Sequence, residues 1–551
     1  MAPQTTTATD GQTPNTTVKH TGLPEAHRDT TREIFETVVF VVVLVLMLKL
    51  FVAEAFVIPT GSMAPTLWGD QMRCTCRECG HKFPINASRN IDPTHMTGYV
   101  CENCGFPYTE SDWKKDLSSV SSGDRVLVSK YEYHLRDPRR FDIPVFKYPV
   151  EPFSIEEKQG MNYIKRLVGL GGETLAVFAG DLYTTKDLTY DHIPMEARPQ
   201  NELDAWQFRY MYTQDPEAKK YFDSGKFEIV RKSPDEITTV RRIVFDLDHQ
   251  PISKSGTERT RWNLVPEDSK GWEMEAAGFK HRGDEPGFVR YQHIDPWHGN
   301  PQPYLISDHI GYNNGESTSL PFRDNLGQDM QHWVSDLLVE CTVEIASPDN
   351  EVILELNKGA NRCQATFVKG ECRLVRYFSE GTKETRIEMG SHGTKMTKPG
   401  KYSLRLANVD SRLTVWVDGK AIPFGREQSD YPSPPPSKKF EPTENDRMQP
   451  ARVGARGDVK VTKVSLWRDL QYNCAWYQKP SRRKPLDPLP NEIQDCDHVQ
   501  TYYVQPGHYL MFGDNSNSSA DSRSWGLVPK RLLLGRAVVV YWPWWRLGVI
   551  E

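Results

Sequence analysis

The amino-acid sequence predicts a mainly β protein that is preceded by one apolar helix. Beyond residue 57, short segments alternate between apolar and polar residues, which is typical of half-buried strands. They predict strands over residues 125–131, 164–169, 337–345, 352–356, 401–406, 412–417 and 536–541. An apolar run precedes these segments, and its length is near the roughly 20 residues with which a helix crosses a membrane. Two Cys-x-x-Cys pairs have the spacing of a metal site.

The N-terminal region divides into a polar segment and the apolar run. Residues 1–36 are rich in Thr, Pro and Gln, and we expect a disordered cytoplasmic N-terminus because they cannot bury enough apolar surface. The apolar run predicts a transmembrane helix over residues 37–56, with Lys49 reaching the headgroups. Basic residues before the run favour an N-terminus inside the cell. The alternative is a cleaved signal peptide, for which Val52-Ala-Glu-Ala55 is a weak match.

Length and composition limit the function classes. A chain of 551 residues suggests two to four domains. Its net charge is only −5, and its basic runs are short, which disfavours nucleic-acid binding. Ten cysteines are too few for a disulfide scaffold in a chain of this length.

Ser62 and Lys165 are the candidate catalytic pair. Ser62 follows the apolar run closely, and Gly61 beside it lets the backbone approach a substrate. Taken alone, Ser62 could equally be a linker serine. A serine hydroxyl needs a base beside it, and no histidine is near Ser62 in the sequence. Lys165 has apolar neighbours, and burial among them would lower its pKa enough for that role.

Several sequence blocks resemble those of bacterial type I signal peptidases, peptidase family S26. They occur in the family's order and are Ile58–Leu67, Gly123–Tyr131 with Arg140–Phe146, Met161–Glu173 and Gly513–Pro529. The resemblance implies a signal-peptidase β core at 57–70, 123–180 and 500–551. It also implies a serine endopeptidase of the bacterial cytoplasmic membrane, with its catalytic domain on the extracytoplasmic side. Such an enzyme removes signal peptides from secretory preproteins after small residues at −1 and −3, without a catalytic cofactor.

The resemblance also implies a role for each site residue. Ser62 attacks the peptide carbonyl, and Lys165 takes and returns the proton. Thr60 holds the position of a serine whose hydroxyl stabilises the oxyanion. Ser519 matches the serine that orients the lysine, and Asp521 and Arg523 match a bracing charge pair.

The chain departs from the family's pattern in the supporting loops. Phe141 replaces a usual glycine, Gly171 a usual proline and Glu173 a usual aspartate. Ser516-Asn-Ser518 replaces Arg-Asp-Asn. None of these positions belongs to the dyad, so the departures affect the expected shape of the loops.

A first insertion, residues 71–122, is expected to be a zinc ribbon. Its metal ligands would be Cys76, Cys79, Cys101 and Cys104, with Cys74 as an alternative ligand. A pair of disulfides is the competing interpretation, because the compartment would be oxidising. A structural or partner-binding role fits its separation from the catalytic motifs.

A second insertion separates the lysine block from the last block. Residues 181–300 are left unassigned, and residues 301–475 resemble a laminin-G or concanavalin-like β-sandwich, which is jelly-roll-like. Such a domain could bind a glycan or a protein, or serve only for packing. Residues 476–499 are expected to be a linker. The aromatic segment Tyr541–Trp545 would be either buried core or a patch at the membrane interface.

Two other function classes compete with a signal peptidase. One is a non-enzymatic, lectin-like membrane adaptor with a decayed peptidase core, which the intact motif residues disfavour. The other is a different Ser–Lys peptidase, such as a self-cleaving repressor, which the predicted anchor disfavours.

Overall fold

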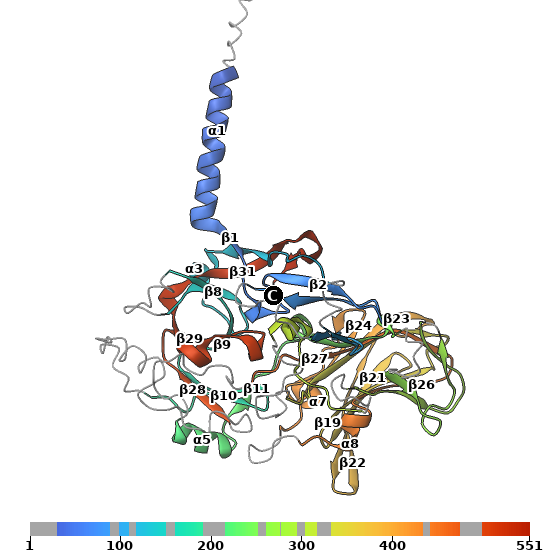
Figure 1. Ribbon diagram of the computed structural model, residues 1–551. Coiled ribbons are helices and arrows are strands. Elements are labelled where there is room, and N and C mark those ends of the chain that lie inside the picture. Colours follow the sequence, from blue (N-terminus) through green and yellow to red (C-terminus); the bar gives the residue numbers. More distant parts are fainter. Residues whose placement is uncertain are drawn as a thin grey trace, which may run out of the picture. The chain divides into compact units, whose positions relative to one another are not determined.

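A computed structural model describes residues 30–88, 98–109, 117–149, 160–190, 215–251, 261–275, 277–294, 303–316, 332–433, 441–473 and 499–550. The chain divides into one unit that ends at Val52 and a second unit that begins at Ala53 (Figure 1). The second unit is built mainly of strands, which confirms the mainly β prediction.

The first unit is helical, with bounds that differ from the prediction. α1 (Thr30–Met47) continues into a π-helix, η1 (Leu48–Val52). Residues 30–36 were expected to be disordered, but they form the first turns of α1, where Arg32 and Glu36 make an ion pair one turn apart. Residues 1–29 lie outside the described part of the chain.

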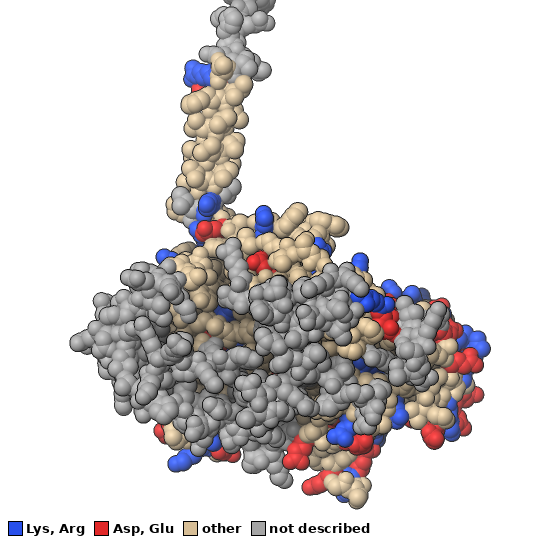
Figure 2. Space-filling view, in the orientation of Figure 1, with Lys and Arg blue, Asp and Glu red and all other residues tan. Residues whose placement is uncertain are grey.

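The predicted transmembrane helix over 37–56 also ends too late. Residues 53–56 belong to the strand β1 (Ala53–Val57), because they pair with β6 (Arg125–Ser129). No helix among the described residues is both long and apolar enough to cross a membrane. The side chains of α1 from Val38 to Met47 are apolar and exposed, and its surface is almost wholly tan in Figure 2.

The core that carries the catalytic motifs is built from strands far apart in the sequence. One sheet has the order β1–β6–β31–β7–β8, with β32 paired to β31. The further bounds are β31 (Leu533–Trp542), β7 (Pro144–Lys147), β8 (Asn162–Ile164) and β32 (Gly548–Val549). β6 and β31 agree with the strands that the sequence predicts there.

Two smaller sheets complete this core. The first has the order β12–β11–β10–β28, and the second β30–β29–β9. Their strands are β10 (Glu173–Phe178), β11 (Asp181–Thr185), β12 (Glu228–Ile229), β28 (Gln500–Val504), β29 (His508–Phe512), β30 (Val528–Pro529) and β9 (Arg166–Gly169). The expected single strand over 164–169 is therefore divided at Lys165, since β8 pairs with β7 while β9 pairs with β29.

The first insertion forms two hairpins. β2 (Gln71–Thr75) pairs with β3 (Lys82–Asn86), and β4 (Gly98–Val100) pairs with β5 (Pro107–Thr109). Each Cys-x-x-Cys pair lies in the turn of one hairpin. The two ends of the insertion lie side by side. Gly123, just after the insertion, donates its N–H to Oδ1 of Asp70, just before it, over 3.0 Å.

The second insertion is dominated by two large sheets. The first contains β13 (Arg242–Asp246), β15 (Trp272–Glu275), β16 (Gly278–His281), β18 (Leu337–Ile345), β23 (Gly400–Val409), β24 (Arg412–Val417), β25 (Lys420–Ala421) and β27 (Val459–Arg468). The second contains β14 (Trp262–Leu264), β17 (Gly287–Tyr291), β19 (Glu351–Lys358), β20 (Asn361–Val368), β21 (Glu371–Glu380), β22 (Lys383–Gly393) and β26 (Ala451–Arg456). Side chains from both sheets share one buried apolar core.

The sandwich begins earlier than the predicted residue 301. β13 to β17 come from the range that was left unassigned, yet β13 and β16 pair with β27, and β17 pairs with β26, near the end of the insertion. These strands have only three to five residues each, which is too few for a clear alternation. The predicted linker over 476–499 lies outside the described residues except for Val499.

Helices are short outside α1. Among the described residues of the second unit, the α-helices are α3 (Glu132–Leu135), α5 (Pro216–Asp223), α6 (Pro234–Val240), α7 (Arg426–Ser429), α8 (Glu444–Met448) and α9 (Ser522–Trp525). The 3-10 helices used below are η2 (Gly61–Met63), η6 (Gly311–Glu316) and η8 (Ser516–Ser518). Trp544 and Trp545 are exposed by 71% and 46%, so of the two alternatives for the aromatic segment, buried core does not hold.

Candidate active site

Ser62 and Lys165, 103 positions apart in the chain, are in hydrogen-bonding contact. Ser62 lies in the short 3-10 helix η2, which directly follows the extended residue Thr60. Lys165 lies at the break between β8 and β9. Lys165 Nζ is 2.5 Å from Ser62 Oγ, and the lysine is only 2% exposed. A general base must be within this reach of the hydroxyl that it deprotonates.

Burial makes the Lys165 amine a weaker base than an ordinary lysine. The loss of hydration lowers the pKa of Lys165 to about 8, against the opposing charges of Asp521 and Asp514. The neighbouring Arg523 guanidinium lowers the same pKa further. A substantial share of the amine is therefore neutral near physiological pH, which is the form that accepts a proton.

Asp521 and Arg523 brace the loop that carries the last motif. Their side chains form a buried ion pair of 2.6 Å, and Asp521 Oδ2 also accepts the Gly513 N–H at 2.9 Å. The Arg523 guanidinium donates in addition to the carbonyl oxygens of Asn473 and Ser516. The pair thus fixes a segment that lies against the nucleophile.

Ser519 and Thr60 both lie beside the dyad segment. A Cβ added at Gly513 would be 2.1 Å from Ser519 Oγ and 2.5 Å from the Ser62 carbonyl oxygen. Ser519 and the backbone of Ser62 therefore both lie close to Gly513. A residue with a side chain would not fit at that position. Thr60 is exposed, extended (φ −126°, ψ 155°) and makes no side-chain cap to η2.

A second buried charge cluster, which the sequence did not indicate, is centred on Asp514. Arg166 donates to both carboxylate oxygens of Asp514 over 2.8 and 2.7 Å, with exposures of 1% and 0% for the two side chains. Thr66 Oγ1 donates to Asp514 Oδ2 over 2.5 Å. The second insertion adds Arg242, whose Nη2 is 3.5 Å from the same oxygen. Asp514 thus joins the nucleophile segment to the strand that follows Lys165.

The second insertion also touches the nucleophile segment directly. Asn313 of η6 exchanges two amide hydrogen bonds with Asn515, of 2.8 and 2.7 Å. Asn515 in turn donates to the carbonyl oxygens of Gly61 and Ser62. Tyr312 is 1% exposed and packs on Gly61, where an added Cβ would be 2.2 Å from its Cε1.

Replacing Gly61 with alanine is expected to reduce catalysis by about tenfold or more, because the buried Tyr312 ring must move and displace Ser62. The second change Tyr312→Ala removes the clash and should restore part of the rate. The measurement is kcat/KM for a peptide substrate in the single and double variants. Equal rates for wild type and Gly61→Ala would show that this contact does not position Ser62.

The four cysteine thiols converge with the geometry of a tetrahedral metal site. Their sulfur atoms all lie within 4.8 Å of one another. The Cys76–Cys104 and Cys79–Cys101 sulfur distances are 3.6 and 3.7 Å, near the edge of a tetrahedron with zinc–sulfur bonds of about 2.3 Å. None of the eight described cysteines forms a disulfide.

The alternative ligand Cys74 is outside this group. Its sulfur donates to the Tyr99 hydroxyl at 3.6 Å instead. Gly80 and Gly105, one after each cysteine pair, have φ of 71°, the left-handed conformation that the tight turns need. The four thiols of Cys76, Cys79, Cys101 and Cys104 therefore have a geometry that could hold a metal ion such as zinc.

The sequence was compared with known families and proteins. The family described as "Signal peptidase, peptidase S26" matches residues 114–235 and 414–542. Proteins similar to this chain in sequence include several signal peptidases. Probable signal peptidase I-2 of Synechocystis sp. is 51% identical over 47 residues, which cover 8% of this chain and 22% of that protein. Signal peptidase I of Pseudomonas aeruginosa is 29% identical over 147 residues, which cover 24% and 31%.

These matches cover only parts of both proteins. The chain spans about a fifth to a third of the length of these two relatives. Similar solved structures include carbohydrate binding module CBM66 from Bacillus subtilis, at 12% identity over 38% of this chain and 95% of that one, with a TM-score of 0.23. Sheep galectin-11 is 14% identical over 30% and 98%, with a TM-score of 0.17. TM-scores this low carry no conclusion about fold or ligand.

Proposed function

We propose that the protein is a signal peptidase, a serine endopeptidase that uses Ser62 and Lys165 as its dyad. The contact of 2.5 Å between Lys165 Nζ and Ser62 Oγ, within a buried setting, carries this proposal. The S26 match and the signal peptidase relatives support the class of enzyme. The intact buried network around the dyad disfavours an adaptor with a decayed core.

The proposed reaction proceeds through an acyl-enzyme. Ser62 Oγ attacks the carbonyl carbon, while its proton passes to the neutral Lys165 amine. Lys165 then gives that proton to the departing amine as the peptide bond breaks. A water molecule hydrolyses the ester with Lys165 again as the base, which regenerates the serine. The Thr60 hydroxyl and the Ser62 N–H are the proposed oxyanion donors, and one such donor contributes roughly 3 kcal/mol.

Lys165 is also placed next to an edge strand. β8 is the outer strand of its sheet among the described residues and ends at Ile164, directly before Lys165. An extended peptide that paired with β8 would present its carbonyl groups beside the dyad. Preproteins with small residues at −1 and −3 are the proposed substrates.

Attachment to the bacterial cytoplasmic membrane is part of the proposal, with an N-terminus in the cytoplasm and the catalytic domain outside. The exposed apolar side chains of α1 support it. Independent support comes from Trp544, Leu547 and Val549, which are exposed by 71%, 67% and 74%. Aromatic and apolar side chains of this kind favour the interface between membrane and water.

The test is an assay with the detergent-solubilised full chain and a preprotein. N-terminal sequencing of the product is expected to show a single cut after small residues at −1 and −3. A matched preprotein with a bulky residue at −3 should remain uncut. Cleavage of both substrates, or of neither, would contradict the proposal.

We propose a structural zinc ion at the four-cysteine site. Elemental analysis of the purified protein should find about one zinc per chain. Cys101→Ser should lower the zinc content and the melting temperature together, because metal binding contributes to folding. Cys341→Ser, a buried cysteine of β18, is the control that should leave the zinc content unchanged. The zinc site would be contradicted if the purified wild type contained no zinc, or if Cys101→Ser lost the zinc but kept the wild-type melting temperature.

For the sandwich insertion, we propose a packing role towards the catalytic core. Tyr312 and Asn313 contact the Gly61–Asn515 region, which supports this role.

A further inference from the structure

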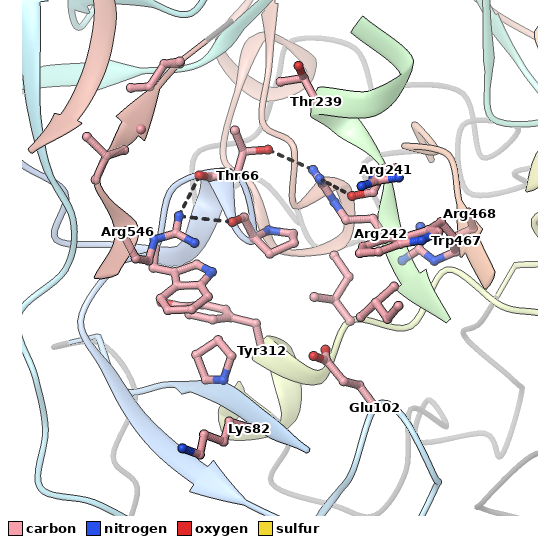
Figure 3. Close-up of a pocket in the computed structure, with 18 of the residues that line it drawn as sticks. Thr66, Lys82, Glu102, Thr239, Arg241, Arg242, Tyr312, Trp467, Arg468 and Arg546 are labelled. Atoms are coloured by element: carbon pink, nitrogen blue, oxygen red, sulfur yellow. Dashed lines mark hydrogen bonds between the residues drawn. The ribbon is translucent and has the colours of Figure 1, made fainter. Parts of the chain in front are cut away.

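A cavity of about 500 Å³ lies where the catalytic core and both insertions meet (Figure 3). Pro65 and Thr66 line it from the core, Lys82 and Glu102 from the cysteine-rich insertion, and Arg468 from the sandwich. Its volume is in the range of small-molecule sites. Neither residue of the dyad lines it, so it is separate from the proposed peptidase site.

The charged side chains that line the cavity are mostly cationic. The lysine and arginine residues are Lys82, Arg241, Arg242, Arg468 and Arg546. Glu102 is the only carboxylate among the described lining residues. Figure 3 shows Arg546 on one side of the space and Arg241, Arg242 and Arg468 together on the other, with Glu102 below Trp467. An anion inside the cavity would therefore meet positive charge from several walls.

Two of these arginines are buried without an adequate counter-ion. Arg242 is 4% exposed, its Nε has no hydrogen-bond partner in the described part of the chain, and its nearest carboxylate, Asp514, is already held by Arg166. Arg468 is 3% exposed and donates only to backbone carbonyl oxygens, with no salt bridge among the described residues. Burial lowers the pKa of Arg468 to about 10. A buried charge of this kind is costly unless an ion pairs with it.

The other two arginines are already compensated and fixed in place. Arg241 pairs with Glu340 at 2.7 Å, and Arg546 pairs with Asp124 at 2.8 Å. Both guanidinium groups also lie over indole rings, of Trp467 and Trp68. The charge left for a ligand therefore belongs chiefly to Arg242 and Arg468.

We propose that this cavity binds a phosphate-bearing ligand. Arg242 and Arg468 occupy paired positions of the neighbouring strands β13 and β27. A tetrahedral phosphate offers more acceptor oxygens than a carboxylate, so it is suited to engage both guanidinium groups at once. Val540 and Val549 form an apolar part of the wall, and Val549 is 74% exposed. This chemistry occurs in the headgroup of an anionic lipid and in a soluble phosphate ester.

The cavity is also joined to the nucleophile segment. Arg242 donates to Thr66 Oγ1 over 3.1 Å, and Arg546 donates to the Thr66 carbonyl oxygen over 2.9 Å, as the dashed lines in Figure 3 show. Thr66 is four residues after Ser62 in the chain. Both arginines thus hold the segment from the cavity side.

The test measures binding to the full chain in a phosphate-free neutral detergent, without peptide substrate. The probes are inorganic phosphate, glycerol 3-phosphate and a short-chain phosphatidylglycerol, each titrated by calorimetry. At least one probe is expected to bind saturably, and Arg468→Gln and Arg242→Gln should weaken it by about tenfold or more. Arg373→Gln, an exposed arginine on β21, should leave the affinity unchanged.

The probes distinguish the two sources of phosphate. Tighter binding of phosphatidylglycerol than of glycerol 3-phosphate identifies a lipid headgroup, while equal binding identifies a soluble phosphate. If the two buried-arginine variants fail to fold by circular dichroism, Lys82→Gln replaces them, since Lys82 is exposed and lines the same cavity. No saturable binding to the wild type, or equal affinity in the folded cavity variants, would overturn the proposal.

Discussion

Replacing Ser62 with alanine is expected to slow preprotein cleavage by at least about 10⁴-fold, because the attacking oxygen is lost. Lys165→Ala should slow it to a similar extent, since no other base takes the place of the amine that contacts Ser62 Oγ. Residues that act as a unit are not additive, so the double variant should be no slower than either single variant. The measurement is kcat/KM in the preprotein assay.

The matched control is Lys460→Ala, a partly exposed lysine that pairs with Glu275 in the sandwich. It removes the same charge and should leave the rate within about twofold of wild type. Wild-type cleavage by the Ser62→Ala or Lys165→Ala protein would exclude the dyad. A double variant that is much slower than both single variants would mean that the two residues act separately.

Asp514→Ala is expected to lower the free energy of unfolding by about 3–5 kcal/mol, because it leaves Arg166 buried without its partner. The loss also affects Thr66 and Arg242, which share the same carboxylate. Denaturant unfolding of the two proteins measures the difference.

Two further variants separate the charge effect from a general loss of packing. Asp137→Ala breaks an exposed ion pair with Lys530 and should leave the unfolding free energy nearly unchanged. The double variant Asp514→Ala with Arg166→Met removes both buried charges and should recover part of the stability. If Asp514→Ala is no less stable than Asp137→Ala, the buried network does not support the site.

The sequence was sufficient to place the chemical groups of the site. Gly61-Ser62 and Lys165 were found as motifs, and the two cysteine pairs were found by their spacing, because both patterns are local. Strands β6, β18 and β24 were also predicted, since their residues alternate clearly. These features depend on residues that are close together in the sequence.

Contacts between distant segments could not be predicted. Tyr312 and Arg242 reach the nucleophile region from within the second insertion, and no motif or periodicity marks either of them. The division of β8 from β9 at Lys165 was also missed, because the apolar residues on both sides looked like one continuous strand. Tertiary pairing, which decided these features, leaves no local pattern.

One departure from the family's pattern has a clear structural consequence. Phe141 stands where the family usually has glycine, and its φ is 71°, a conformation that glycine adopts without strain. The Phe141 side chain is buried in the core, and its carbonyl oxygen accepts a hydrogen bond from Arg166. Burial of the ring contributes favourably to stability and so opposes the cost of the positive φ.

The most direct test of the dyad is the pH dependence of kcat/KM with a substrate that does not titrate between about pH 6 and 10. The base must be neutral, and burial lowers the pKa of Lys165 to about 8. The rate should therefore rise with pH and level off above an apparent pKa of about 8. A rate that is independent of pH, or that rises only near the ordinary lysine pKa of about 10.4, would contradict a buried neutral amine as the base.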